Sequence, residues 1–196
     1  GLGDVYKRQP LLMAINSRWD KHRRRMHMRH PNLPDLQFNP DDAGDQKRFL
    51  EWSAPLMPKN RAKSARLIRA AECGLTDTDY PSISIGNLSS HRAVSQKLGR
   101  DLSVLRWRTN IWLDGLAPWE EFDWIGRIIE IGKVQFEICE RVQRCLATTA
   151  NPETGLRDAD TLGILQTWDH KDFCVYARVL NTGTIHLNDS AKAPNP

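Results

Sequence analysis

The chain has 196 residues, enough for one well-buried domain and part of another, since folding units typically run to about 100–150 residues. Its 40% hydrophobic and 27% charged residues are ordinary for a soluble protein, and no apolar run approaches the roughly 20 residues that cross a bilayer. The net charge of +4 is small, so the composition as a whole does not indicate a nucleic-acid-binding or membrane protein.

The first nine residues, GLGDVYKRQ, differ in character from the rest of the chain. They resemble a translated sequencing-adaptor remnant, so we exclude them from the fold prediction. On this interpretation the native protein begins further upstream, and the chain lacks part of it.

Residues 10–39 alternate apolar and polar side chains, which predicts short strands over LLMAINSRW, RMHMRH and DLQF, separated by Pro31 and Pro34. Asp41 or Asp42 is then expected to cap a helix through KRFLEW, which ends before Pro55. We expect residues 10–60 to be the remnant of an N-terminal β-barrel domain.

The positive charge is concentrated in Lys21 to His30, KHRRRMHMRH. Met26 and Met28 alternate with polar neighbours, which favours a hairpin whose arginines lie at the solvated tip and outer face. A nucleic-acid surface is the alternative, and we do not expect it.

The second part of the chain, residues 61–190, reads as a β-rich domain with short helices. RAKSARLIRAAE is compatible with either a helix or a strand. Ile83 and Ile85 predict a strand, and Ser89 or Ser90 is expected to cap a helix that Gly99 ends.

Aromatic residues dominate from Arg106 to Gly132, which predicts the core. A hairpin follows over RIIEI and VQFEICERV, then a turn at NPETG, a helix through DADTLGILQTW and two last strands, FCVYARVL and TIHLND. The fold class is therefore mainly β (α+β).

Four cysteines, at positions 73, 139, 145 and 174, form no CxxC pair, which disfavours zinc and a secreted disulfide scaffold. A cytoplasmic protein is expected. Cys145 follows Arg144 at the end of a predicted strand; a cationic neighbour favours the thiolate, the form that binds metals. A buried, inert thiol is the more frequent role of a free cysteine.

Two further segments offer polar groups for a ligand. If residues 106–110 form a strand, alternation puts Arg106, Arg108 and Asn110 on one face, where they could bind phosphate or a polar heterocycle. Surface ion pairs with Asp101, Asp114 or Glu120 are the alternative, and from the residues alone we favour it. Ser89 and Ser90, before a helix, could contact an anion or merely cap the helix.

Three segments, taken in order, resemble the signatures of the MOSC domain family: RWRTNIWLDGLAPWEEFDWIG, RCLATTANPETG and DFCVYARV. The resemblance covers about Arg61 to Asp189 and implies a β-rich, barrel-like domain with short helices. It implies that Cys145 binds the molybdenum of a molybdopterin cofactor, beside Arg144. It also implies cofactor contacts from Arg106, Arg108 and Asn110, and less securely from Ser89 and Ser90.

Relatives of the YcbX and amidoxime-reducing kind imply an oxidoreductase that reduces N-hydroxylated or N-oxygenated small molecules. Electrons then come from an external flavin or iron-sulfur protein. Pyridoxal phosphate binding is a family association only. The alternative is a sulfur or cofactor carrier that uses Cys145 without turnover.

The sequence departs from the family pattern at three places. Thr109 stands where Pro or Gly is usual, Cys174 replaces the glycine of an F-G-V-Y stretch, and Leu187-Asn188-Asp189 replaces V-G-D. The family's N-terminal lysine and serine, which also hold the cofactor, are expected in the missing upstream part.

Overall fold

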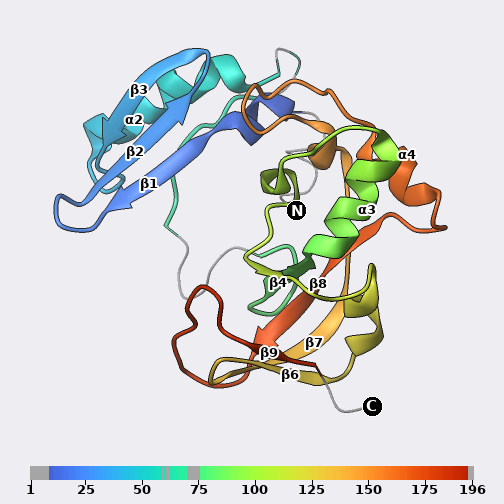
Figure 1. Cartoon of the computed structure of the whole chain (residues 1–196). Helices are drawn as coiled ribbons and strands as arrows, with labels where there is room; N and C mark the ends of the chain where they lie inside the picture. The colour runs from blue at the N-terminus through green and yellow to red at the C-terminus, as the bar shows by residue number, and fades with distance from the viewer. Residues whose placement is uncertain (1–8, 59, 61, 70–75, 194–196) are drawn as a thin grey trace.

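The computed structural model describes residues 9–58, 60, 62–69 and 76–193. It is mainly β with short helices, as predicted, and consists of a small three-stranded sheet and a six-stranded, barrel-like sheet (Figure 1). Residues 1–8 of the proposed adaptor remnant, Arg61 and Cys73 lie outside the described residues.

The three-stranded sheet is an antiparallel meander of β1 (Asn16–Asp20), β2 (Arg25–His30) and β3 (Leu33–Phe38). The predicted hairpin is confirmed, because β1 and β2 pair directly around a turn at residues 21–24. Residues 10–14 form a 3-10 helix, η1 (Pro10–Ala14), instead of the start of a strand, since Pro10 supplies no N–H for a sheet.

Helix α2 (Ala43–Ser53) packs on this sheet, and its N-cap is Asp42, as predicted. The side chain of Asp42 accepts a hydrogen bond from the backbone N–H of Asp45. A 3-10 turn, η2 (Ala54–Leu56), follows the helix at Pro55. The core between helix and sheet contains buried or partly buried apolar side chains: Leu36, Phe38, Trp52, Leu56, Met26, Met28 and Phe49.

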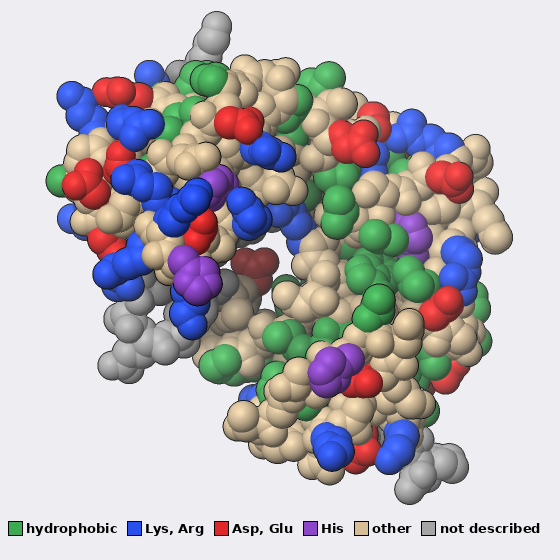
Figure 2. Space-filling view, turned by 60° about the vertical axis from the view of Figure 1, so that its left-hand side comes forward, with side chains coloured by type: hydrophobic (Ala, Val, Ile, Leu, Met, Phe, Trp, Pro, Cys, Tyr) green, Lys and Arg blue, Asp and Glu red, His purple; other side chains and the backbone are tan. Residues whose placement is uncertain are grey.

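Basic side chains gather on the part of the surface formed by the small sheet (Figure 2). Several are paired with carboxylates, among them Arg25 with Asp45 and Arg29 with Asp35. Residues 62–69, which come after this part, form neither helix nor strand, so the described part of RAKSARLIRAAE adopts neither alternative.

The six-stranded sheet has the order β5-β4-β8-β7-β6-β9. Its strands are β4 (Ile83–Asn87), β5 (Ile111–Leu113), β6 (Ile128–Ile131), β7 (Val134–Gln143), β8 (Asp172–Val179) and β9 (Ala191–Lys192). The pair β4–β5 is parallel and the other pairs are antiparallel. The predicted β6–β7 hairpin and the strand β8 are confirmed.

The strand predicted over residues 184–189 is wrong, because the last strand is β9. The backbone N–H of Asp189 instead bonds the carbonyl of His186, and the Asp189 carboxylate accepts the N–H of His186. Such local side-chain and turn bonds compete with a sheet ladder.

Helices α3 (Leu88–Leu98) and α4 (Thr161–Gln166) pack together beside the sheet (Figure 1). Gly99 ends α3 in the left-handed conformation, as predicted, but the N-cap is Asn87 and neither of the two serines. Short 3-10 turns connect the strands: η3 (Val104–Trp107), η4 (Glu120–Trp124) and η5 (Leu146–Thr149). No described helix is both long enough and apolar enough to span a membrane.

Candidate functional site

Cys145 lies where β7 ends and η5 begins. The ten-residue strand β7 buries alternate side chains, and its partner β8 holds the chain beyond its end, since the Arg144 N–H bonds the carbonyl of Lys171. The Cys145 carbonyl accepts hydrogen bonds from the N–H and the hydroxyl of Thr148, which closes the turn. The Cys145 side chain is half-buried rather than sealed in the core.

Two cavities meet at Cys145, one of about 240 Å³ and one of about 710 Å³. They share the residues Asp77, Gln143, Arg144, Cys145 and Tyr176. We call the smaller one, which adds Arg106 and Arg108, the inner cavity, and the larger one the outer cavity. Cys145 therefore lines a space that three arginines also line.

Arg144 is fastened to the core by two backbone carbonyls. Its Nε donates to Phe173 O over 2.8 Å and its Nη1 to Trp107 O over 2.9 Å. Its Nη2 is buried and has no hydrogen-bond partner among the described residues. The guanidinium also lies beside the buried thiol of Cys174, where its charge acts against the rise in the pKa of that thiol.

The strand predicted over residues 106–110 is wrong. Ser103 caps the 3-10 turn η3, and Arg108 has a left-handed backbone with φ 53°. Trp107 is fully buried and stacks on Phe173, with ring centroids 3.8 Å apart. Burial of this indole, together with the serine cap, overrides the five-residue alternation. The three polar residues consequently do not share one strand face.

Arg106 and Arg108 nevertheless both line the inner cavity. Arg106 is 3% exposed and forms an ion pair with Asp158 over 2.6 Å, not with the nearer carboxylates expected from the sequence. The Arg108 side chain donates from Nη2 to Met13 O over 3.1 Å. The N-terminal turn η1 thus supplies part of the cavity wall.

Asn110 lies outside both cavities. Its Oδ1 accepts hydrogen bonds from the backbone N–H of Ser84 at 2.8 Å and from the Ser84 hydroxyl at 3.1 Å. The amide therefore connects the start of β4 to the segment before β5, which is a structural role.

Ser89 and Ser90 also lie outside both cavities. The buried Ser90 hydroxyl donates to the Glu121 carboxylate over 2.9 Å and accepts the Trp119 N–H. The Ser89 hydroxyl accepts a hydrogen bond from Arg92. The structure does not bring either serine to Cys145.

Asp77, Tyr176 and Asp158 were not identified from the sequence. Asp77 comes from an irregular segment and Tyr176 from β8, and both line the two cavities. Burial, then the charge of Asp77, raises the pKa of Tyr176. Asp158 belongs to the predicted helix start, so only the fold reveals its contact with Arg106.

Cys174 has φ 71° and is fully buried. A positive φ strongly favours glycine, which gives a physical reason for the glycine of the F-G-V-Y pattern that Cys174 replaces. Burial raises the pKa of the Cys174 thiol to about 11, and its Sγ lies 3.0 Å from the Thr109 hydroxyl. Cys174 is a packing residue and lines neither cavity.

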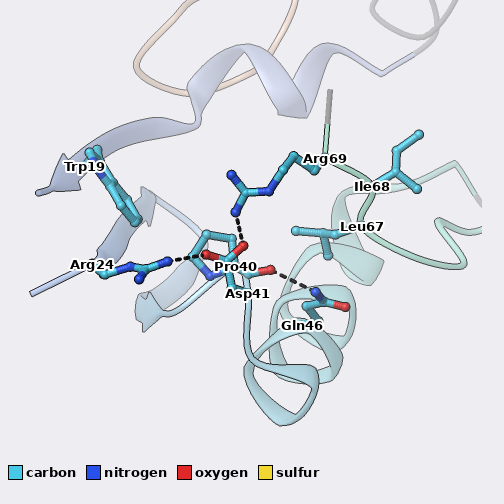
Figure 3. Close-up of a pocket in the computed structure, with 8 residues that line it drawn as sticks. All are labelled: Trp19, Arg24, Pro40, Asp41, Gln46, Leu67, Ile68 and Arg69. Atoms are coloured by element: carbon cyan, nitrogen blue, oxygen red, sulfur yellow. Dashed lines mark hydrogen bonds and ion pairs between the residues drawn. The ribbon is translucent and has the colours of Figure 1, made fainter. Parts of the chain in front are cut away.

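Another cavity, of about 410 Å³, lies on the three-stranded sheet and shares no lining residue with those at Cys145 (Figure 3). Arg24 and Arg69 both bond the Asp41 carboxylate there, between Trp19 and the apolar Leu67. Because the Asp41 carboxylate partly neutralises the two guanidinium groups, this cavity is not part of the candidate site.

No three His, Cys, Asp or Glu side chains gather as a metal site within the described part of the chain. A soft thiolate suits a metal that already has sulfur ligands, and guanidinium groups suit phosphate. The donors around the inner cavity fit a sulfur-rich, phosphate-bearing metal cofactor.

Sequence comparisons place the chain in a known protein family and find two curated relatives. The family model described as MOSC domain matches residues 77–192. The chain is 34% identical over 122 residues to molybdenum cofactor sulfurase of Drosophila willistoni, which covers 62% of this chain and 15% of that protein. It is 30% identical over 115 residues to mitochondrial amidoxime-reducing component 1 of Danio rerio, which covers 54% of this chain and 33% of that protein. The chain thus spans a third or less of these curated relatives.

Proposed function

Because the chain belongs to the MOSC domain family, we propose that it binds a molybdenum cofactor at Cys145 and reduces N-oxygenated small molecules. The observation that carries the proposal is the half-buried thiol beside a cavity lined by Arg106, Arg108 and Arg144. The similarity to an amidoxime-reducing protein supports the reaction class.

Each residue has a part in this proposal. The Cys145 thiolate is the protein ligand of the metal. Arg108 and Arg144 bind the anionic groups of the pterin, while Trp107 forms an apolar wall. Asn110, Ser89 and Ser90 support the surrounding strands rather than the ligand, in line with their own hydrogen bonds.

When bound, the cofactor supplies a two-electron centre that can remove oxygen from an N–O group. The outer cavity, which shares Cys145 with the inner one, is the entrance for the small-molecule substrate in this proposal. The electrons come from an external flavin or iron-sulfur protein.

The decisive experiment measures molybdenum and pterin in protein purified from a host that makes molybdopterin. Wild-type protein is expected to contain molybdenum close to stoichiometry, and Cys145→Ala is expected to lose it. Cys139→Ala is the matched control, because Cys139 is a half-buried thiol of β7 that lines neither cavity. Equal metal in wild type and Cys145→Ala contradicts the proposal.

A carrier function is the second candidate, supported by the similarity to a cofactor sulfurase. Here Cys145 carries a sulfur atom as a persulfide and no substrate is reduced. Intact-protein mass spectrometry distinguishes the two: a reducible added sulfur on Cys145 without molybdenum favours the carrier. Stoichiometric molybdenum with reduction of an N-hydroxylated amidine favours the enzyme.

A further inference from the structure

The loop that follows Cys145, residues 146–149, is held by hydrogen bonds from two arginines. Arg106 Nη1 donates to the carbonyls of Thr149, at 3.3 Å, and Thr148, at 3.5 Å. Arg157 donates to the carbonyl of Leu146 and to the Thr149 hydroxyl. These bonds connect three carbonyls and a hydroxyl of η5 to arginines outside the turn, so the guanidinium groups help to fix the loop conformation.

Asp158 holds Arg106 in this position. Its Oδ1 lies 2.6 Å from Arg106 Nη2, and its Oδ2 binds Arg100 at 2.9 Å and the Asn151 amide at 3.0 Å. Its backbone N–H also donates to Thr149 O over 3.1 Å. The same residue therefore contacts the loop directly and neutralises the buried cation that binds it.

Arg106 differs from the other two arginines of the inner cavity in having a carboxylate partner, Asp158, whereas the hydrogen bonds described above for Arg108 and Arg144 go to backbone carbonyls. Arg106 is 3% exposed, and two of its three nitrogens already have protein partners. A buried guanidinium with a carboxylate and two carbonyls stabilises one geometry of its neighbours. Because the Asp158 carboxylate already offsets its charge, Arg106 is less suited to an anionic ligand and is well placed to fix the loop beside Cys145.

We propose that Asp158 is a positioning residue for Cys145 that acts through Arg106 on residues 146–149. The carboxylate keeps Arg106 turned to the loop carbonyls, and the fixed loop keeps the thiol at the junction of the two cavities. The effect of Asp158 on metal binding rests on the proposed function. Its effect on the conformation of the loop does not depend on that function.

The test compares Asp158→Asn with Asp114→Asn. Asp114 also forms an ion pair with an arginine, Arg92 at 2.8 Å, but both side chains are exposed and line neither cavity, so its variant controls for loss of such a pair. In Asp158→Asn, we expect several-fold faster alkylation of Cys145 by iodoacetamide. We also expect faster amide exchange at Thr148 and Ala150, and about tenfold weaker molybdenum retention. Asp114→Asn should match the wild type in all three.

A milder variant keeps the test decisive if Asp158→Asn does not fold. Arg100→Gln removes one partner of Asp158, and the Arg100 side chain is 45% exposed, so the fold should survive. It should accelerate Cys145 alkylation by a smaller factor. Wild-type alkylation and exchange in the folded variants overturn the inference.

The two proposals fail in different ways. Wild-type protein without molybdenum, combined with faster alkylation in Asp158→Asn, contradicts the proposed function and supports the positioning role. Wild-type protein with molybdenum, combined with unchanged metal, alkylation and exchange in Asp158→Asn, supports the function and overturns the positioning role.

Discussion

The indole Nε1 of Trp107 donates a hydrogen bond to Nδ1 of His91 over 3.0 Å. Because Nδ1 accepts, the ring proton lies on Nε2, which donates to Leu102 O, also at 3.0 Å. The imidazole is therefore the neutral tautomer. Trp107 forms part of the inner cavity wall, so an uncharged histidine supports the candidate site from behind.

Acid should weaken this support. Burial lowers the pKa of His91, so the neutral ring contributes stability above the unfolded-state pKa of about 6.5. That contribution is lost as pH falls through the lower pKa of the folded state. Urea unfolding should show that wild type loses stability relative to His91→Gln as the pH falls from 7 to 5. Parallel curves for the two proteins contradict the prediction.

Glu121 should give the opposite pH dependence. It is fully buried, accepts hydrogen bonds from Asn87 and Ser90, and burial raises its pKa. A raised pKa means that its stabilisation is complete below the unfolded value of about 4.3 and is lost as pH rises through the folded value. Glu121→Gln should remove this slope in urea titrations, and Glu120→Gln should keep it. A wild-type slope in Glu121→Gln excludes the assignment.

Substitutions of Cys174 test the left-handed backbone. Cys174→Val should lower the free energy of unfolding by about 2–3 kcal/mol, because a β-branched side chain is strained at φ 71°. Cys174→Gly should stay within about 1 kcal/mol of wild type, since relief of strain offsets the lost thiol packing. Chemical denaturation measures both. A valine variant as stable as the glycine variant contradicts the strain.

Loss of the Asp158 carboxylate should also be visible in stability. Asp158→Ala leaves the buried Arg106 without its ion-pair partner and should cost about 2–3 kcal/mol. Asp114→Ala removes a pair whose side chains are 62% and 52% exposed, and should cost at most about 1 kcal/mol. Urea melts at neutral pH give both values. Equal losses mean that burial of Arg106 does not matter.

The stability of the protein at acid pH should also depend on the Asp158 carboxylate. Partial burial raises the pKa of Asp158, but hydrogen bonds from Arg106, Asn151 and Arg100 outweigh it, so the pKa is lowered overall. The ionised carboxylate therefore stabilises the fold above its unfolded-state pKa of about 3.9, and this stabilisation is lost as the pH falls through the lower pKa of the folded state. This window lies on the acid side of the one expected for His91, so the two effects can be separated in one titration.

Much of the fold was predictable from local patterns. The β1–β2 hairpin follows from the alternation of Met26 and Met28, the α2 cap from Asp42, and the end of α3 from Gly99. In each case residues close in sequence decide the structure through side-chain period, capping or backbone freedom. The division between residues 10–60 and 61–190 stays a prediction.

The candidate site was less predictable, because long-range packing decides it. Burial of Trp107 against Phe173 turns residues 104–107 into a 3-10 helix, so Asn110 points to Ser84 instead of the cavity. The partner of Arg106, Asp158, lies 52 residues further along the chain. No spacing rule in one sequence connects two such positions.

The hydrogen bond from Arg108 to the carbonyl of Met13 has a practical consequence for protein engineering. A shortened chain that starts at residue 77, where the family match begins, would delete Met13 and open one side of the inner cavity. The minimal fragment for crystallisation or ligand screening should therefore include η1, even though that turn lies outside the matched segment.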